Sequence, residues 1–138
     1  MRVDFYILPS DNLAERDQFA CQIIEQAFLS HHKLFVATHS ADQAQQLDEL
    51  LWAFRPDSFV PHAQAGTIAA PVIIGTLAQS RPGYDVWVNL SNQQPPIDAK
   101  VQQLIEIVAK VPEHQQAARD RFRQYRELGY VLNTHNIS

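Results

Sequence analysis

The sequence predicts an α/β fold in which a mostly parallel sheet is flanked by helices in three layers. Two observations support this prediction. Short runs of β-branched and aromatic residues alternate along the chain with longer segments in which apolar residues recur every three or four positions, as expected when strands alternate with helices. Neither an internal repeat nor a low-complexity tract interrupts the 138 residues, so we expect one domain, 1–138. In outline the fold is Rossmann-like.

The first half of the chain supplies two predicted strand–helix units. Pro9 ends the first strand. Ser40 and Gln43 match a capping box at the start of the second helix, and the Arg55-Pro56 pair ends that helix. The predicted elements are a strand at 3–8, a helix at 13–30, a strand at 33–38 and a helix from 40 to 55.

The second half of the chain has a less regular pattern. Residues 97–107 are ambiguous, and a helix that runs into a strand near 105–110 is one interpretation. Pro112 suits the first turn of a last helix, because its missing N–H would be unpaired there, and Gly129 suits its end. The other predicted elements are a loop at 56–70, strands at 71–74 and 84–90 joined by a turn at 79–83, and a last strand at 130–132.

Several kinds of chemistry are missing from the sequence. Its four glycines form no Gly-rich loop that could bring backbone amides against a nucleotide phosphate, which argues against a nucleotide enzyme. The histidines His31, His32, His39 and His62 have neither metal-ligand spacing nor a second cysteine nearby, and we interpret them as solvated or capping residues. We expect no catalytic residues, no metal and no other cofactor.

The location of the protein is predicted from what the chain lacks. No apolar run approaches the roughly 20 residues that would cross a bilayer, and the apolar start is too short for a signal peptide. Cys21 is a single cysteine in an apolar helical context, which excludes an internal disulfide and indicates a buried structural thiol. We therefore expect a cytoplasmic protein with no membrane contact.

The last predicted helix carries an unusual concentration of charge. Four of the 11 Lys and Arg residues lie between Arg119 and Arg126, although the net charge of the chain is -4. A helical wheel predicts an apolar face, a cationic flank and a distant acidic side, made respectively of Ala118, Phe122 and Tyr125, of Arg119, Arg123 and Arg126, and of Asp120 and Glu127. Arginine binds carboxylates and phosphates through two parallel hydrogen bonds, so the pattern indicates a docking surface for an anion. A solvated amphipathic helix, with its arginines paired to nearby acids, is the alternative.

Three segments resemble one protein family. The run from Arg119 to Arg126, followed by Gly129 and Leu-Asn-Thr at 132–134, resembles the C-terminal signature of the chi subunit of bacterial DNA polymerase III holoenzyme. Leu-Asp-Glu-Leu-Leu-Trp at 47–52, followed by Ser-Phe-Val-Pro-His at 58–62, resembles the central signature of that family. The first predicted strand is a weaker match. Together the segments cover essentially the whole chain.

The resemblance implies a non-catalytic accessory subunit in DNA replication. Chi proteins pair with the psi subunit, which ties them to the clamp loader, and they bind the acidic C-terminal tail of single-stranded-DNA-binding protein, which ends in Pro-Phe. Contact with DNA would be indirect. The implied tail-binding residues are Val111, Gln115, Arg119, Phe122, Arg123 and Thr134. At two of these positions the chain departs from the family, since Gln115 replaces a frequent lysine and Phe122 a common tyrosine.

The central signature implies a second surface, which would contact psi. Its implied residues are Trp52, Phe59, Val60 and Pro61. Phe59 lies in a polar context and is expected to be exposed, because exposed aromatic residues commonly anchor partners. A core position is the alternative for Trp52.

Two other functions are consistent with parts of the sequence. The chain could bind single-stranded nucleic acid directly, with the arginines of the cationic flank on phosphates and Tyr125 or Tyr130 stacked on bases. The net charge of -4 argues against this function. A small-molecule enzyme on a Rossmann-like frame is the third possibility, although it lacks a visible catalytic set.

Overall fold

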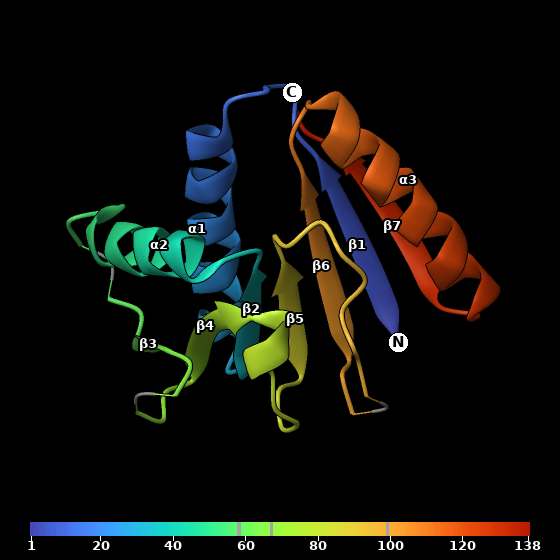
Figure 1. Cartoon of the computed structure of the whole chain (residues 1–138). Helices are drawn as coiled ribbons and strands as arrows, with labels where there is room; N and C mark the ends of the chain where they lie inside the picture. The colour runs from blue at the N-terminus through green and yellow to red at the C-terminus, as the bar shows by residue number, and fades with distance from the viewer. Residues whose placement is uncertain (58, 67, 99) are drawn as a thin grey trace.

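The computed structural model describes residues 1–57, 59–66, 68–98 and 100–138. Within these ranges it contains one sheet of seven parallel strands and three α-helices (Figure 1). The predicted fold class is therefore confirmed. In chain order the elements are β1 Arg2–Ile7, α1 Leu13–Leu29, β2 Leu34–Thr38, α2 Ala41–Ala53, β3 His62–Gln64, β4 Val72–Thr76, a 3-10 turn Leu77–Gln79, β5 Val86–Asn89, β6 Gln103–Val108, α3 Pro112–Glu127 and β7 Val131–Asn136.

The three helices lie on the two faces of a single sheet. The strands lie in the order β3-β4-β2-β5-β6-β1-β7, so β3 and β7 form the two edges of the sheet. Buried residues of α1 and α2 pack with one set of alternating strand residues, and those of α3 pack with the other set. Because neighbouring residues of a strand point to opposite faces, α1 and α2 cover one face and α3 covers part of the other (Figure 1).

The burial of the central strands explains why their apolar runs could be recognised in the sequence. Every residue of β2 is buried, as expected for a central parallel strand covered on both faces. Cys21 of α1 is fully buried, and its burial raises the pKa of the thiol to about 12. The predicted structural role of this cysteine therefore agrees with its position.

The start of α2 differs in one detail from the predicted capping box. The Ser40 hydroxyl accepts the N–H of Gln43, at 3.1 Å, as expected. The Gln43 side-chain oxygen does not return this bond to Ser40, because it accepts the backbone N–H of His39 at 2.7 Å instead. Only half of the box is formed, and the side chain of Gln43 is held over the end of β2.

Three predictions in the second half of the chain were wrong. The predicted loop at 56–70 contains β3, whose three residues are too few to form a recognisable pattern. The described residues of 97–102 form no helix, and a strand follows at 103–108; Ala99 lies outside the described residues. The last strand continues to Asn136 and not only to residue 132, because an exposed edge strand can carry polar residues.

Candidate functional site

A pocket of about 630 Å³ lies between α3 and the sheet. The helix contributes one wall, and the strands β1, β6 and β7 contribute the other. The lining residues are Phe5, Ile7, Val108, Gln115, Gln116, Ala118, Arg119, Phe122, Arg123 and Thr134. Five of the six residues that the sequence suggested for tail binding are among them. We call this cavity the α3 pocket.

Helical spacing explains the helix wall of the α3 pocket. Gln115, Arg119 and Phe122 are four and three residues apart, which places them on one face of α3. The Phe122 ring packs against the Phe5 ring of β1, with centroids 5.4 Å apart. Phe5 and Ile7 are two residues apart on β1 and therefore point to the same face of the sheet. The pocket consequently has an apolar floor with polar side chains at its rim.

One predicted pocket residue does not line the cavity. Val111 is the N-cap of α3 and is absent from the pocket lining. Val108, the last residue of β6, lines the pocket instead. β6 ends at Val108 and α3 begins at Pro112, so Val111 belongs to the connection between them. The alternation of β1 and β6 was the signal that could have identified Phe5, Ile7 and Val108.

The cations at the rim of the α3 pocket differ in their partners. Arg119 is exposed, and the described residues provide it with neither an ion pair nor a hydrogen bond. Arg123 bonds to the Asp120 carboxylate one turn earlier, and both side chains are more than half exposed. The wheel placed Asp120 far from the cationic flank, which was wrong because residues three apart on a helix are neighbours. Arg119 is therefore the cation that is available to a ligand.

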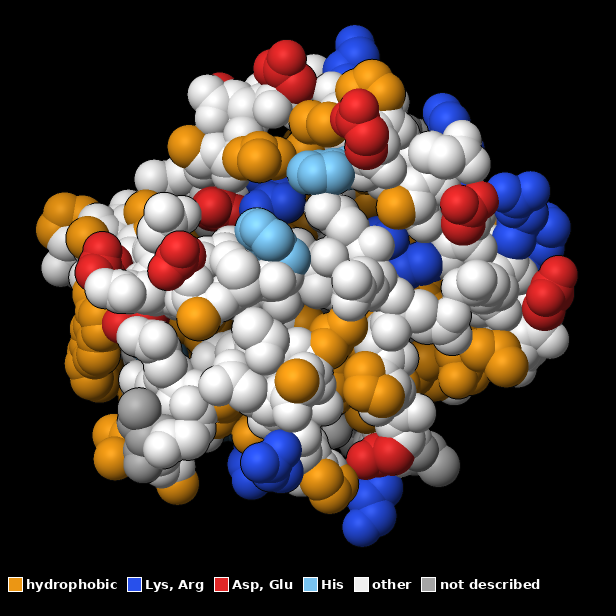
Figure 2. Space-filling model, viewed as in Figure 1, with side chains coloured by type: hydrophobic (Ala, Val, Ile, Leu, Met, Phe, Trp, Pro, Cys, Tyr) orange, Lys and Arg blue, Asp and Glu red, His pale blue; other side chains and the backbone are white. Residues whose placement is uncertain are grey.

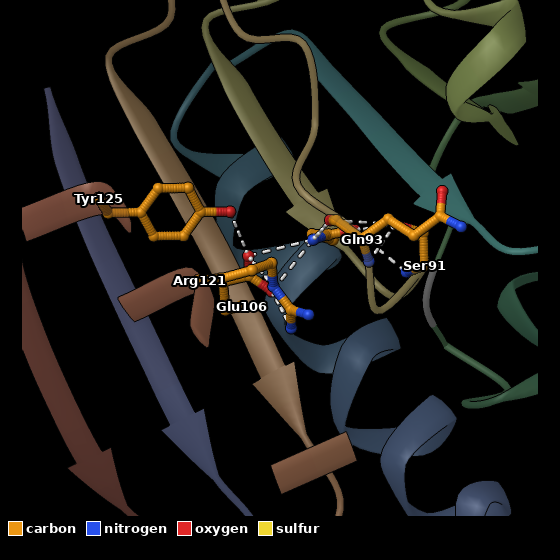
Figure 3. Close-up of polar contacts among 6 residues, drawn as sticks. Ser91, Gln93, Glu106, Arg121 and Tyr125 are labelled. Atoms are coloured by element: carbon orange, nitrogen blue, oxygen red, sulfur yellow. Dashed lines mark hydrogen bonds and ion pairs between the residues drawn. The ribbon is translucent and has the colours of Figure 1, made fainter. Parts of the chain in front are cut away.

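Arg121 belongs to the interior, although it lies within the cationic run of the sequence. It is 4% exposed, and its guanidinium donates to both carboxylate oxygens of Glu106 at 3.0 and 3.1 Å. Figure 3 shows that Tyr125 also donates to Glu106, at 2.7 Å. Asn89 of β5 donates to the same carboxylate at 3.0 Å. This buried network fixes the position of α3 against β6, and thereby the geometry of the α3 pocket.

The network also affects the ionisation of Tyr125. Burial raises the pKa of its hydroxyl, and the negative charge and hydrogen bond of Glu106 raise it further. The hydroxyl therefore remains a hydrogen-bond donor, as the contact with Glu106 requires. Because Tyr125 is 1% exposed, its ring is not available for stacking on a base.

A second surface lies near the opposite edge of the sheet, beside α2 and β3. Trp52 is 50% exposed and Phe59 is 68% exposed, with ring centroids 5.6 Å apart. Figure 2 shows hydrophobic side chains gathered at the left margin, on the side of the molecule where α2 lies. Pro61 is half-buried. We call Trp52, Phe59 and Pro61 the aromatic surface.

The exposure of Trp52 and Val60 tests two expectations about this surface. The core alternative for Trp52 was wrong, because half of its side chain is exposed. Val60 is only 2% exposed and packs in the core, so its side chain does not contribute to the aromatic surface. Its neighbour Phe59 is 68% exposed, so only one of these two adjacent side chains packs inward. Ser58 of the central signature lies outside the described residues.

The described residues offer neither a metal-binding cluster nor a helix that could span a membrane. Within them, no group of three or more His, Cys, Asp or Glu residues could hold a metal ion. The helices that are described also include none long and apolar enough to cross a membrane.

The fold and the α3 pocket define an α/β domain with a basic pocket at one edge and exposed aromatic residues at the other. Residues 1–133 match the family described as DNA polymerase III chi subunit, HolC. The chain therefore belongs to the family of DNA polymerase III chi subunits, which are accessory subunits in DNA replication.

Curated relatives agree with this assignment. The chain is 39% identical over 139 residues to the DNA polymerase III subunit chi of Pseudomonas aeruginosa, with 99% of this chain and 96% of that protein covered. It is 31% identical over 138 residues to the protein of the same name from Escherichia coli, with 94% of each covered. The chi subunit of Haemophilus influenzae is 30% identical over 137 residues, covering 96% and 95%. The matches therefore extend over nearly the full length of both chains.

Proposed function

We propose that this chain is an adaptor within the DNA polymerase III holoenzyme. The α3 pocket binds the acidic C-terminal tail of single-stranded-DNA-binding protein, and the aromatic surface binds the psi subunit. The chain thereby links the clamp-loader complex to protein-coated single-stranded DNA in the bacterial cytoplasm. It contributes no catalytic group of its own, and nucleotide addition belongs to other subunits of the complex.

The observation that carries the proposal is an unpaired arginine beside an apolar cavity. A peptide that ends in Pro-Phe brings a ring and a carboxylate on the same residue. The ring fits against Phe5 and Phe122, which form the floor of the α3 pocket. Arg119 lines the same pocket, so its guanidinium can bond the terminal carboxylate with two parallel hydrogen bonds.

The remaining rim residues fit a secondary role. Arg123 is more than half exposed and already bonds to Asp120, so it suits the aspartates farther up the tail. Those contacts would be solvent-exposed and each worth about 1 kcal/mol or less. Gln115 lines the pocket without a positive charge, and Phe122 supplies a ring without a hydroxyl. The proposal therefore assigns most of the electrostatic contribution to Arg119.

The separation of the two surfaces supports an adaptor. The α3 pocket includes Thr134 of β7, and the aromatic surface lies beside β3, while β3 and β7 are the two edges of the sheet. Partners at opposite edges can bind at the same time without overlapping. Phe59→Ala should consequently weaken binding to psi and leave tail binding unchanged, as measured by co-purification and peptide titration. Equal loss of both activities in a folded variant would contradict the assignment of the two surfaces.

Direct binding of single-stranded DNA is the competing function, and one titration separates the two. We expect an acidic peptide ending in Pro-Phe to bind with a Kd of about 1 μM, or about -8 kcal/mol. Naked single-stranded DNA should bind far more weakly, because the net charge is -4 and Arg121 is internal. If the DNA binds as tightly as the peptide at the same salt concentration, the adaptor proposal is wrong.

A further inference from the structure

The strand β7 forms an exposed edge of the sheet. An edge strand presents N–H and C=O groups that can pair with another chain, and proteins usually protect such edges by keeping them short or by placing Lys or Pro on them. The opposite edge strand, β3, is short, with three residues. β7 has six residues, Val-Leu-Asn-Thr-His-Asn, with neither Lys nor Pro among them. The edge at β7 is therefore suited to pairing with a further strand.

The hydrogen bonds to β1 show which backbone groups of β7 face outward. The N–H of Val131 donates to the carbonyl of Met1 at 3.1 Å, and the N–H of Ile137 donates to that of Ile7 at 2.9 Å. In a parallel pair every second residue faces the neighbouring strand, so the odd-numbered residues of β7 pair with β1. Within the described part of the chain, nothing bonds to the outward N–H and C=O groups of the residues between them. These residues are Leu132, Thr134 and Asn136.

The outward residues of β7 direct their side chains to the face of the sheet that α3 covers. Leu132 packs with the core cluster on that face, and Thr134 lines the α3 pocket. Thr134 lies opposite Phe5 of β1, whose ring forms part of the pocket floor. The ring of His135 points to the other face and stacks on Tyr6, with centroids 4.6 Å apart. The free edge and the α3 pocket therefore meet at Thr134, where α3 lies along β7 (Figure 1).

We propose that the acidic tail of single-stranded-DNA-binding protein binds β7 as an added antiparallel strand, with its terminal Phe opposite Thr134. This inference rests on the proposed function, because it takes the tail as the occupant of the α3 pocket. Directly opposite residues on neighbouring strands point to the same face of a sheet. The terminal ring consequently enters the α3 pocket beside Thr134. Strand addition of this kind combines main-chain hydrogen bonds with a pocket for a side chain.

Continuity and charge identify the acidic tail as the occupant of this edge. Thr134 belongs both to the free edge and to the pocket, and Arg119 and Arg123 line the same pocket. The positive charges therefore lie beside the end of the added strand that carries the carboxylate. An ionised carboxylate has about four acceptor sites, so it can accept the outward N–H of Thr134 as well as both hydrogen bonds from Arg119.

The proline before the terminal Phe sets the direction of the added strand. In an antiparallel pair, Thr134 exchanges hydrogen bonds with the terminal Phe, and Asn136 exchanges them with the tail residue two positions earlier. The proline lies between these two positions with its nitrogen facing solvent, where prolines of edge strands are found. In a parallel pair the proline nitrogen would face β7, where a donor is needed and proline has none. The tail therefore runs antiparallel and leaves at the carboxyl end of β7.

N-methylated peptides test this pairing, because the methyl group removes one N–H and leaves every side chain unchanged. Three acidic peptides that end in Pro-Phe are titrated into the full chain by calorimetry: the parent, one methylated on the backbone nitrogen two residues before the Phe, and a control methylated three residues before it. The first methyl group removes the donor that faces the Asn136 carbonyl, so binding should weaken about tenfold. The control methyl group faces solvent, and its peptide should bind within about twofold of the parent.

The chain offers a matched pair of variants at the same contact. Asn136→Pro removes an outward N–H and no hydrogen bond to β1, because Asn136 faces away from that strand. The parent peptide should bind this variant about fivefold to tenfold more weakly. Asn136→Ala keeps the N–H and should bind within about twofold of the wild type. Circular dichroism checks that both variants are folded.

Amide hydrogen exchange of the isotope-labelled full chain needs no substitution. Saturation with the parent peptide should slow exchange of the Thr134 and Asn136 N–H groups, because both become paired. Leu132 lies beyond the terminal Phe, so its N–H should exchange as it does in the free chain. This readout decides the proposal even if Asn136→Pro does not fold.

The failure of this inference is distinguishable from the failure of the proposed function. If the parent peptide does not bind, the proposed function is wrong, and the added strand with it. If the parent binds, both methylated peptides bind equally well and Asn136 is not protected, the tail occupies the α3 pocket without pairing to β7, and only this inference is wrong. Weakening at the control position alone would indicate a parallel strand and contradict the proposal. A dimeric mass of the free chain, with all three outward N–H groups protected, would assign the edge to a second copy.

Discussion

The buried carboxylate of Glu106 allows a quantitative prediction. Glu106→Gln keeps the size of the side chain and removes its charge. The new amide nitrogen cannot accept a hydrogen bond, yet it replaces one of the two carboxylate oxygens that accept from Arg121, Tyr125 and Asn89. In the variant, the N–H groups of the new amide face the donor groups of these neighbours. The Arg121 guanidinium, which is 4% exposed, also loses its counter-charge.

The expected cost follows from burial. Glu106 is 0% exposed, and removing one partner of a buried ion pair destabilises a protein by about 3 to 5 kcal/mol. Domains of this kind are stable by about 5 to 15 kcal/mol in total, so the variant should be marginally folded. With a urea dependence of about 2 kcal/mol per M, the unfolding midpoint should fall by about 2 M.

Urea unfolding followed by circular dichroism measures this effect, with equal m-values in the two proteins as the check that only stability changed. The double variant Glu106→Leu, Arg121→Leu is the companion, because replacing both partners with apolar residues is often close to neutral. It should be more stable than Glu106→Gln. A loss below about 1 kcal/mol in Glu106→Gln would show that the network does not anchor α3.

The remaining predictions concern two ion pairs near the surface, His32 with Asp85 and Arg123 with Asp120. Burial raises the pKa of Asp85, but hydrogen bonds from His32 and from a backbone N–H outweigh it, so the folded pKa lies below the ordinary 3.8. The resulting stability is present above pH 3.8 and is lost as the pH falls through the folded pKa; Asp85→Asn should remove this acid dependence in pH-resolved unfolding. Asp120→Ala should free Arg123 and strengthen binding of the acidic peptide about two- to threefold in a calorimetric titration, whereas weaker binding would show that Asp120 orients Arg123 for the ligand.

Local periodicity accounts for the parts of the structure that were predicted. The helix wall of the α3 pocket depends only on the spacing of Gln115, Arg119 and Phe122, which any α-helix preserves. The opposite wall depends on which strands lie beside β1. The strand order is set by long-range pairing, and no local pattern encodes it. For this reason the sequence did not identify Val108 as a lining residue, whereas Val111, three positions later, was named from the family resemblance.

Arg121 shows that basic residues close together in the sequence need not lie on the same face of a helix. It lies between Arg119 and Arg123 in the sequence, yet it is buried and they are exposed. Its partner is a glutamate within the apolar strand Gln-Leu-Ile-Glu-Ile-Val of β6. A charged residue in such a strand needs a buried counter-charge, and this was the available signal. Thr134 lies in a polar edge strand, whose exposed residues carry little strand pattern.

The contact between Arg119 and the terminal carboxylate of the tail is the central claim, and a double-mutant cycle tests it most directly. The wild type and Arg119→Ala are titrated with the acidic Pro-Phe peptide in its free-acid and C-terminally amidated forms. In the wild type, amidation should cost about 1.5 to 3 kcal/mol, the scale of a hydrogen bond to a charged group. In Arg119→Ala it should cost almost nothing, because the carboxylate has already lost its partner. If amidation weakens binding equally in both proteins, the guanidinium and the carboxylate do not interact, and the α3 pocket does not bind the tail in the way proposed.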